Sequence, residues 1–258
     1  MSIKNNNPPD WPDVLILTRK GGNYGTGHYN RMHLLQNHLR KMKISSEIKL
    51  EEQFSKNYQS GKIVILDSRD DEFPALLLSQ KKYDHFFLAI DNRGNGRLQC
   101  DIIWDTLPHI SMNDREFCGA LKNCILHPLI SRQTSRPDQA KIIQKSIREI
   151  EAMPGQVDLI QYMENKRVPM PEKDFHDKLI SADSVATYYG QTFFEALYLG
   201  KTIYLYDISE YHRQLSDWFC ARWIQNPDAA HIFDGQGLHR LAVLIRSILS
   251  GVLDYRIG

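Results

Sequence analysis

A group of small and basic residues follows an apolar run near the start of the chain, in the stretch RKGGNYGTGHYNRM at residues 19–32. Gly25 and Gly27 permit a tight turn with exposed backbone N–H groups. A helix that begins there adds unpaired N–H donors and the positive end of its dipole, which together suit a phosphate or a sugar oxygen. The same dipole disfavours added positive charge on His28, so we expect a neutral, partly exposed imidazole that can act as a general base.

The spacing of these glycines separates the loop from two common phosphate-binding loops. No Gly-Lys-Ser/Thr follows, as a P-loop requires, and the order G-x-x-G-x-G differs from the dinucleotide pattern G-x-G-x-x-G. Arg31 lies one turn into the helix, where a guanidinium suits either phosphate contact or a bracing salt bridge. The structural alternative for the whole stretch is a β-to-α turn with a capping histidine.

The pattern of apolar residues predicts alternating strands and helices in the first half. Strands are expected at 13–18, 44–50, 62–67, 85–91 and 100–105, with helices at 27–43 and 74–83. Strands separated by helices indicate βαβ units and a parallel sheet. Residues 1–12 are polar and Pro-rich, so we interpret them as a disordered arm.

The second half predicts a similar alternation. Strands are expected at 123–130, 156–163, 183–189 and 201–207, and helices at 137–153, 171–182, 190–200 and 238–253. The predicted fold is therefore α/β, with two Rossmann-like domains that face a cleft. The first spans residues 13–115 and carries the glycine loop, and the second, reduced domain spans residues 116–258.

Composition excludes several classes of protein. The 258 residues carry a net charge of +1 and no long basic block, so nucleic-acid binding is not expected. No run of 18 apolar residues predicts a membrane span, and no signal peptide is visible at the amino terminus. We expect a cytoplasmic protein, and the sequence makes no prediction of its oligomeric state.

The four cysteines fit no disulfide framework and no CxxC pair, which indicates reduced thiols. A zinc site that uses Cys118, Cys124 and His127 is the alternative, although buried thiols also behave as small apolar residues. The adjacent Asp70 and Asp71 point apart in an extended chain. We therefore expect neither a metal nor a cofactor.

Several segments together resemble a known family. GTGHYNR is similar to the G-x-G-H-x-x-R loop of the nucleotide-sugar hydrolases of the pseudaminic-acid pathway, which release UDP from a 2,4-diacetamido-2,4,6-trideoxy sugar. VILDS, FFLAIDNRGNGRLQCDIIWD and LISADSVATYYGQTFFEALYLGKTIYLYD resemble later segments of that family in the same order. The resemblance covers residues 13–212 and implies the two-domain GT-B fold, which the family shares with the glycosyltransferase that forms lipid II.

The resemblance also implies roles for individual residues of the first half. It makes His28 the base that helps water attack the anomeric carbon while UDP leaves. The residues expected to contact substrate are Gly25, Gly27, Arg31, Asp67, Arg69 and Asp91. In the second half it implies a nucleotide site at a helix start, where Glu195 binds the ribose hydroxyls and Gly190, Gln191 and Thr192 bind the diphosphate. A glutamate that only complements the helix dipole is the alternative.

The chain also departs from the family pattern. Arg69 stands where the family has a tyrosine, and the segment CILHPLISRQTSRPD lacks the family's Gly-Gly-x-Asp loop. Where the family has an Asn-Gln pair, this chain offers Tyr211, His212 and Gln214 instead. The expected activity is hydrolysis of a UDP-linked, or CMP-linked, amino sugar without a metal. The alternatives are a glycosyltransferase on the same scaffold and a non-catalytic nucleotide-sugar-binding or assembly protein.

Overall fold

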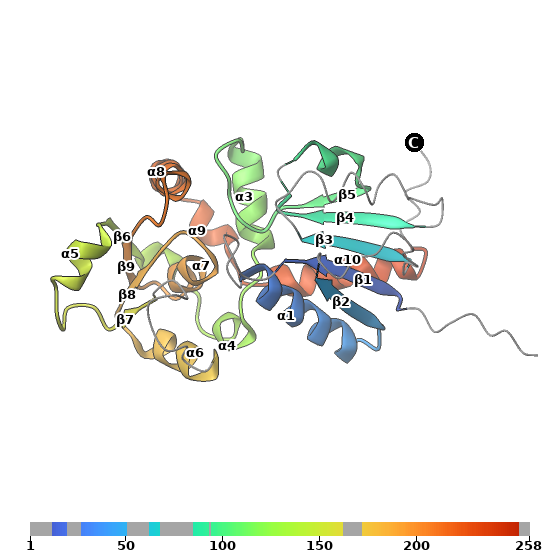
Figure 1. Ribbon diagram of the computed structural model, residues 1–258, viewed down its shortest axis with the longest axis horizontal. Coiled ribbons are helices and arrows are strands. Elements are labelled where there is room, and N and C mark those ends of the chain that lie inside the picture. The colour runs from blue at the N-terminus through green and yellow to red at the C-terminus, as the bar shows by residue number, and fades with distance from the viewer. Residues whose placement is uncertain are drawn as a thin grey trace, which may run out of the picture. The chain divides into compact units, whose positions relative to one another are not determined.

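The computed structural model describes residues 12–19, 27–50, 62–67, 85–92, 94–161 and 172–252. Within these residues the fold is α/β, with one parallel sheet of five strands and a second parallel sheet of four (Figure 1). The parallel strands confirm the α/β class that the alternating apolar pattern predicted, and the sheets belong to two compact units. Residues 1–11 of the predicted arm at 1–12 and the predicted helix at 74–83 lie outside the described residues.

The first unit comprises Met1–Trp104 together with Ala242–Gly258. Its sheet has the strand order β2-β1-β3-β4-β5. The strands are β1 (Val14–Thr18), β2 (Ser46–Leu50), β3 (Ile63–Asp67), β4 (Phe86–Ile90) and β5 (Ile102–Trp104). β1 and β3 are buried along their whole length, which explains why they are continuous apolar runs rather than alternating ones.

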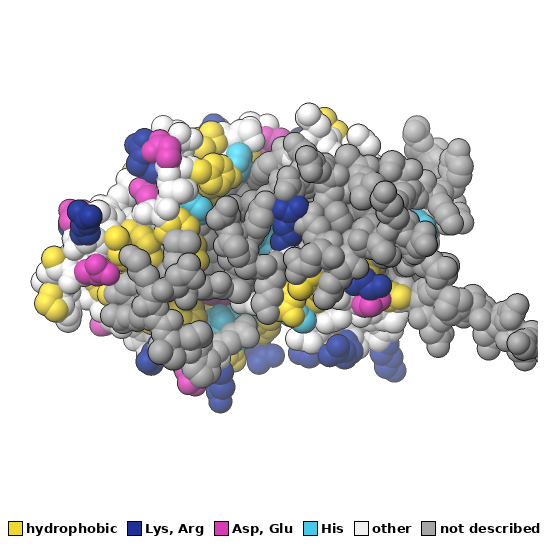
Figure 2. All heavy atoms as spheres, viewed as in Figure 1, with side chains coloured by type: hydrophobic (Ala, Val, Ile, Leu, Met, Phe, Trp, Pro, Cys, Tyr) yellow, Lys and Arg dark blue, Asp and Glu magenta, His cyan; other side chains and the backbone are white. Residues whose placement is uncertain are grey.

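Helix α1 (Gly27–Lys41) follows β1 and packs through a single stripe of buried side chains. Met32, Leu35 and Leu39 form the apolar part of this stripe, and His28 and Arg31 continue it into the first turn. The last turn is basic, which complements the helix dipole, and Figure 2 shows Lys and Arg side chains at the edge where α1 lies. The helix therefore carries two polar residues on the face that it presents to the protein interior.

The second unit comprises Asp105–Leu241 and contains a sheet of strand order β6-β9-β8-β7. Its strands are β6 (Lys141–Gln144), β7 (Leu159–Ile160), β8 (Ser184–Thr187) and β9 (Thr202–Leu205). The helices are α3 (Asp114–Asn123), α4 (Pro128–Ser131), α5 (Ile147–Glu151), α6 (Glu172–Ser181), α7 (Gln191–Tyr198), α8 (Glu210–Gln225), α9 (Ala229–Ile232) and the first part of α10 (Gly237–Leu249). Short 3-10 turns, Asn95–Gln99 in the first unit and Pro137–Gln139 in the second, complete the described elements.

Two sequence predictions in the second unit are wrong. Residues 123–130 do not form a strand, because Pro128 begins α4 and His127 is its N-cap. Residues 137–153 do not form one helix, because residues 141–144 pair with β9 and Ser146 starts α5 with a capping box. Ile142 and Ile143 therefore lie in β6, and Ile147 and Ile150 lie in α5.

The division between the units lies at Trp104, whereas the sequence analysis placed it near residue 115. The residues between these positions contact the second unit. Tyr189 donates a hydrogen bond from its hydroxyl to the carbonyl of Pro108 at 2.7 Å, and His109 Nε2 lies 2.9 Å from the hydroxyl of Tyr211. A second division falls inside α10, between Leu241 and Ala242.

Candidate active site

A histidine and a carboxylate meet where the strand order of the first sheet reverses. In this sheet β2 lies on one side of β1 and β3 lies on the other side. The boundary between β1 and β3 is therefore the topological switch point, at which ligands bind in such sheets. Asp67 is the last residue of β3, level with Thr18 at the end of β1. His28 is the second residue of α1, and its Nδ1 lies 2.7 Å from Oδ1 of Asp67.

The short contact fixes the tautomer that we assign to His28. An ionised carboxylate only accepts hydrogen bonds, so the proton of the neutral ring belongs on Nδ1, where it is donated to Asp67. The lone pair of the ring is then on Nε2. This is the orientation by which a carboxylate prepares an imidazole to take up a proton.

Arg31 joins the same cluster from the next turn of α1. Its Nε donates to Oδ2 of Asp67 at 2.7 Å, and its Nη2 donates to Oδ1 of the same carboxylate. Its Nη1 donates to Oδ2 of Asp91 at 2.5 Å, just past the end of β4. Nη2 also lies 2.9 Å from Nδ1 of His28, which is not a hydrogen bond in the assigned tautomer because both nitrogens then carry hydrogen. Of the two sequence interpretations of Arg31, these contacts favour the bracing salt bridge.

The cluster is deeply buried. His28 is 5% exposed, Arg31 3% and Asp67 0%. Burial alone would raise the pKa of Asp67, but the charges of Arg31 and His28 and their hydrogen bonds hold it at about 2. Burial would likewise lower the pKa of Arg31, but Asp67 and Asp91 raise it above its ordinary value. Both groups are therefore ionised at neutral pH.

The burial of His28 differs from the partly exposed ring that the sequence analysis expected. The expectation rested on the place of His28 at the start of a helix, whereas the ring belongs to the buried stripe of α1 and contacts Asp67. The helix start and Arg31 oppose added positive charge on the ring, and Asp67 favours it. The helix dipole is therefore only one of three electrostatic influences on this histidine.

The remaining predicted residues of the first unit divide into two groups. Gly27 begins α1, and a Cβ placed on it meets no atom within 4 Å, so packing in the described part of the chain does not require glycine there. Gly25 and Arg69 lie outside the described residues, so their predicted substrate contacts stay predictions.

In the second unit, Glu195 lies on α7 and is 2% exposed. Its Oε1 accepts from the backbone N–H of His127 at 3.2 Å and from the side chain of Gln191 at 3.3 Å. Its Oε2 lies 3.6 Å from Nε2 of His176, whose ring stacks on that of His127 with centroids 3.8 Å apart. The carboxylate predicted to bind ribose thus belongs to a buried polar cluster.

The three other predicted nucleotide ligands lie at the start of the same helix. Gly190 is the N-cap of α7, and Gln191 and Thr192 are its first two residues. The side chain of Gln191 also donates to the carbonyl of Ile125. These residues and Glu195 are therefore brought together at one helix, as the sequence predicted, while Gln191 and Glu195 contact other protein groups.

His176 is a member of this cluster that the sequence analysis missed. It lies on the buried face of α6 with Leu179 one turn later, and it is 7% exposed. The helical spacing of Phe175, His176 and Leu179 was the available signal, because it places the histidine on the apolar stripe. The sequence places His127 in the altered loop, where it is an alternative zinc ligand or a buried structural histidine.

Aromatic rings gather past the carboxyl ends of β8 and β9. Tyr188 follows β8, and its ring centroid lies 6.0 Å from that of Tyr206, which follows β9, and 6.1 Å from that of His212 on α8. Tyr188 and His212 are half-buried. This is the edge of a parallel sheet at which ligands bind, and flat rings suit a planar ligand.

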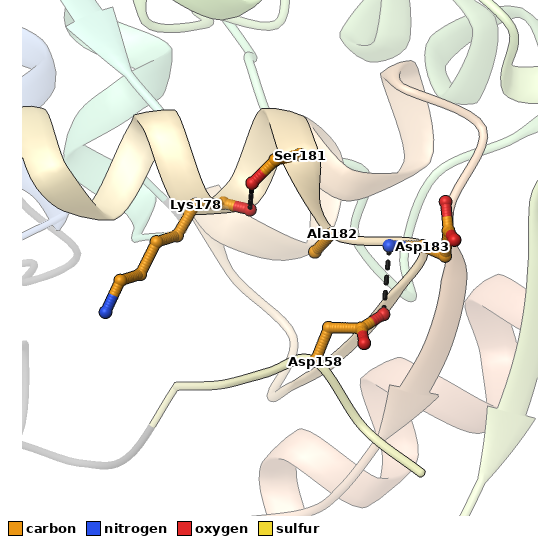
Figure 3. A pocket seen from close by; sticks show the side chains of 5 residues that line it. All are labelled: Asp158, Lys178, Ser181, Ala182 and Asp183. Atoms are coloured by element: carbon orange, nitrogen blue, oxygen red, sulfur yellow. Dashed lines mark hydrogen bonds between the residues drawn. The ribbon is translucent and has the colours of Figure 1, made fainter. Parts of the chain in front are cut away.

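An open depression of about 320 Å³ lies at the opposite edge of this sheet, where β7 and β8 begin (Figure 3). Asp158 accepts there from the backbone N–H of Asp183 at 3.0 Å and from that of Ser184 at 2.8 Å. Hydrogen bonds from Ser184 lower the pKa of Asp158. These contacts fix a turn between two strand starts, so the depression has a structural explanation.

Two general properties complete the description. Among the described residues, no group of three or more His, Cys, Asp or Glu side chains is arranged to hold a metal ion, and this applies to Cys118, Cys124 and His127. Within the same residues, no helix is both long and apolar enough to cross a membrane.

Comparison with known proteins identified no relative. No protein-family model matches the chain, and no curated protein or solved structure matches it either.

Proposed function

We propose that this protein hydrolyses a nucleotide-linked amino sugar, with UDP as the expected nucleotide, without a metal and with His28 as general base. The observation that carries the proposal is the buried hydrogen bond of 2.7 Å between His28 Nδ1 and Asp67 Oδ1 at the switch point of the first sheet. A carboxylate and an imidazole in this relation are suited to activate water.

The proposed reaction is a displacement at the anomeric carbon. His28 Nε2 takes a proton from water while the water oxygen bonds to the anomeric carbon. The bond from that carbon to the diphosphate oxygen breaks, and its electron pair leaves with UDP. The sugar gains a hydroxyl group, and the proton on His28 returns to solvent. Asp67 stabilises the imidazolium that forms during this step.

Binding of the nucleotide is assigned to the second unit. Gly190, Gln191 and Thr192 would present N–H and hydroxyl donors to the diphosphate at the start of α7. The rings of Tyr188 and His212 at the same sheet edge support a planar base. The proposal thus includes a GT-B arrangement, in which the two units share one substrate, and a cytoplasmic location where nucleotide sugars are made.

One observation favours a second candidate, a nucleotide-sugar-binding protein without catalysis. Both oxygens of Glu195 already face protein groups, and His28 is 5% exposed. Ribose binding requires Glu195 to exchange these contacts, and hydrolysis requires water to reach Nε2 of His28. A glycosyltransferase has the same two requirements and uses an acceptor hydroxyl in place of water.

Product analysis separates these functions. The protein is incubated with a panel of UDP-linked and CMP-linked amino sugars, first alone and then with glycan acceptors, and nucleotide release is followed by chromatography. Release without an acceptor supports the hydrolase, and release only with an acceptor supports the transferase. Calorimetric binding without release supports the binding protein. The absence of both binding and release would reject all three functions.

A further inference from the structure

Asp91 occupies a backbone conformation that requires an explanation. It has φ 47°, in the left-handed region that non-glycine residues seldom adopt, and it directly follows β4. Aspartate tolerates this region better than most residues, but such positions persist where the surroundings enforce them. The carboxylate is 5% exposed and receives Nη1 of Arg31 at 2.5 Å.

The residues after Asp91 hold this turn in place. Asn92 is 1% exposed, and its side chain accepts from the backbone N–H of Gly94 at 3.0 Å. Its carbonyl accepts from Nη1 of Arg97 at 2.9 Å. The backbone N–H of Asp91 itself points to the carbonyl of Trp104, at 3.4 Å. The carboxylate of Asp91 is thereby held on a fixed turn.

Arg31 connects Asp91 to the hydrogen-bonded pair of His28 and Asp67, which we call the dyad. Two edges of one planar guanidinium are used, because Nε and Nη2 bind Asp67 while Nη1 binds Asp91. Arg31 cannot rotate about this fork without leaving one carboxylate. Asp91 therefore helps fix the Asp67 oxygen that accepts from His28.

The charge of Asp91 also bears on the protonation of His28. Asp67 on β3 and Arg31 on α1 are charged groups in contact with His28, and Asp91 pairs with Arg31 from just past the end of β4. Asp67 and Asp91 bring two negative charges to one guanidinium, so Asp91 offsets part of the positive charge that Arg31 presents to His28. The charge of Asp91 therefore favours the imidazolium that general-base catalysis produces.

We infer that Asp91 is a positioning residue, which acts through Arg31 to fix Asp67 and to stabilise the protonated form of His28. This inference rests on the proposed function for its catalytic meaning, and it differs from the substrate contact expected of Asp91. The electrostatic part is independent of any substrate.

The test is a titration of His28 by NMR in the full chain, with the resonance assigned by its loss in His28→Ala. Asp91→Asn keeps the shape and the left-handed preference of the residue but removes its charge. We expect the titration midpoint of His28 to fall by about 1 pH unit, the size expected for one nearby charge in a buried cluster. An unchanged midpoint would overturn the inference.

Asp101→Asn is the matched control. Asp101 lies in the same unit and accepts from the backbone N–H of Phe87 at 2.7 Å. The Asp101→Asn substitution also removes one negative charge, and it should leave the titration midpoint of His28 unchanged. An equal shift in both variants would mean a general charge effect and would also overturn the inference.

Asp91→Gly provides a second variant in case Asp91→Asn does not fold. Glycine adopts φ 47° without a steric cost, so the turn is retained while the carboxylate is lost. The same fall in the midpoint is expected, and an unchanged midpoint would again refute the inference. If the parent shows no turnover on any substrate, the proposed function fails, yet this titration still decides the role of Asp91.

Discussion

The buried carboxylate of Asp67 makes the stability of the first unit depend on pH in a defined direction. Its pKa is lowered from 3.8 to about 2, and it is fully buried against Arg31 and His28. This lowering corresponds to about 2–3 kcal/mol of stability. Because the pKa is lowered on folding, this contribution is complete well above pH 3.8 and is lost as the pH falls through about 2.

Asp67→Asn tests this reasoning. At pH 7 the substitution removes the charge from a buried pair and leaves Arg31 with a weaker partner, so we expect a loss of about 3–5 kcal/mol in the free energy of unfolding. As the pH falls from 5 toward 2.5, the parent loses the contribution of Asp67, whereas the variant has no carboxylate to protonate. The difference between the two proteins should therefore shrink by up to about 2 kcal/mol.

The assay is urea unfolding at several pH values, with amide hydrogen exchange of β1 and β3 to follow the first unit separately. Asp101→Asn serves as the control, because Asp101 accepts from the backbone of Phe87 rather than from Arg31. A stability difference between parent and Asp67→Asn that stays constant from pH 7 to pH 2.5 would refute the buried ion network as the origin of the effect.

Three further predictions concern other parts of the chain. Glu195→Gln should weaken UDP binding by about 1–3 kcal/mol in calorimetry if the carboxylate binds ribose, and an unchanged affinity would remove Glu195 from the nucleotide site. Arg69→Ala should reduce turnover of an anionic substrate, since Arg69 replaces the family's tyrosine, and parental kinetics would make it a surface residue. Burial, then Asp217 and Asp207, raise the pKa of Cys220 to about 11, so its alkylation at pH 8 should be about 100-fold slower than that of an ordinary thiol; mass spectrometry showing rapid labelling would contradict this.

The sequence predicted the first sheet well because its strands are buried on both faces. β1 and β3 are continuous apolar runs between polar segments, and α1 has a clear helical stripe. The second unit was harder. The isoleucines at 142, 143, 147 and 150 fit a helical spacing, yet Ser146 divides them between β6 and α5. Periodicity counts apolar residues and is less sensitive to a capping box between them.

Helices α3 and α8 were not predicted, for a related reason. α3 begins in a polar stretch that was interpreted as a domain boundary, although Asn113 and Glu116 form a capping box there. α8 packs through only a few buried residues, among them Leu215 and Phe219, so its apolar stripe is narrow. The capping residues Asn113 and Ser209 mark the starts of α3 and α8 more clearly than the apolar pattern does.

The candidate site was predictable as a set of residue types but not as a set of contacts. His28, Arg31, Asp67 and Asp91 were all named as site residues, and the structure brings them into one cluster. Their pairing depends on the sheet order, which places the ends of β3 and β4 beside the start of α1. A single sequence holds no information on that order, so the role of Asp91 as a partner of Arg31 could not be foreseen.

The most direct test of the central claim is the rate of nucleotide release by His28→Ala. The substrate is the nucleotide sugar that the parent hydrolyses best, and His38→Ala, on the same helix, is the matched control. We predict that turnover falls by about 10²–10⁴, as expected for the loss of a general base. UDP affinity should remain at the parental value. The parental rate should rise with pH as His28 loses its proton, and this rise should disappear in the variant. Parental turnover in His28→Ala, with its pH dependence intact, would contradict the proposed role of the dyad of His28 and Asp67.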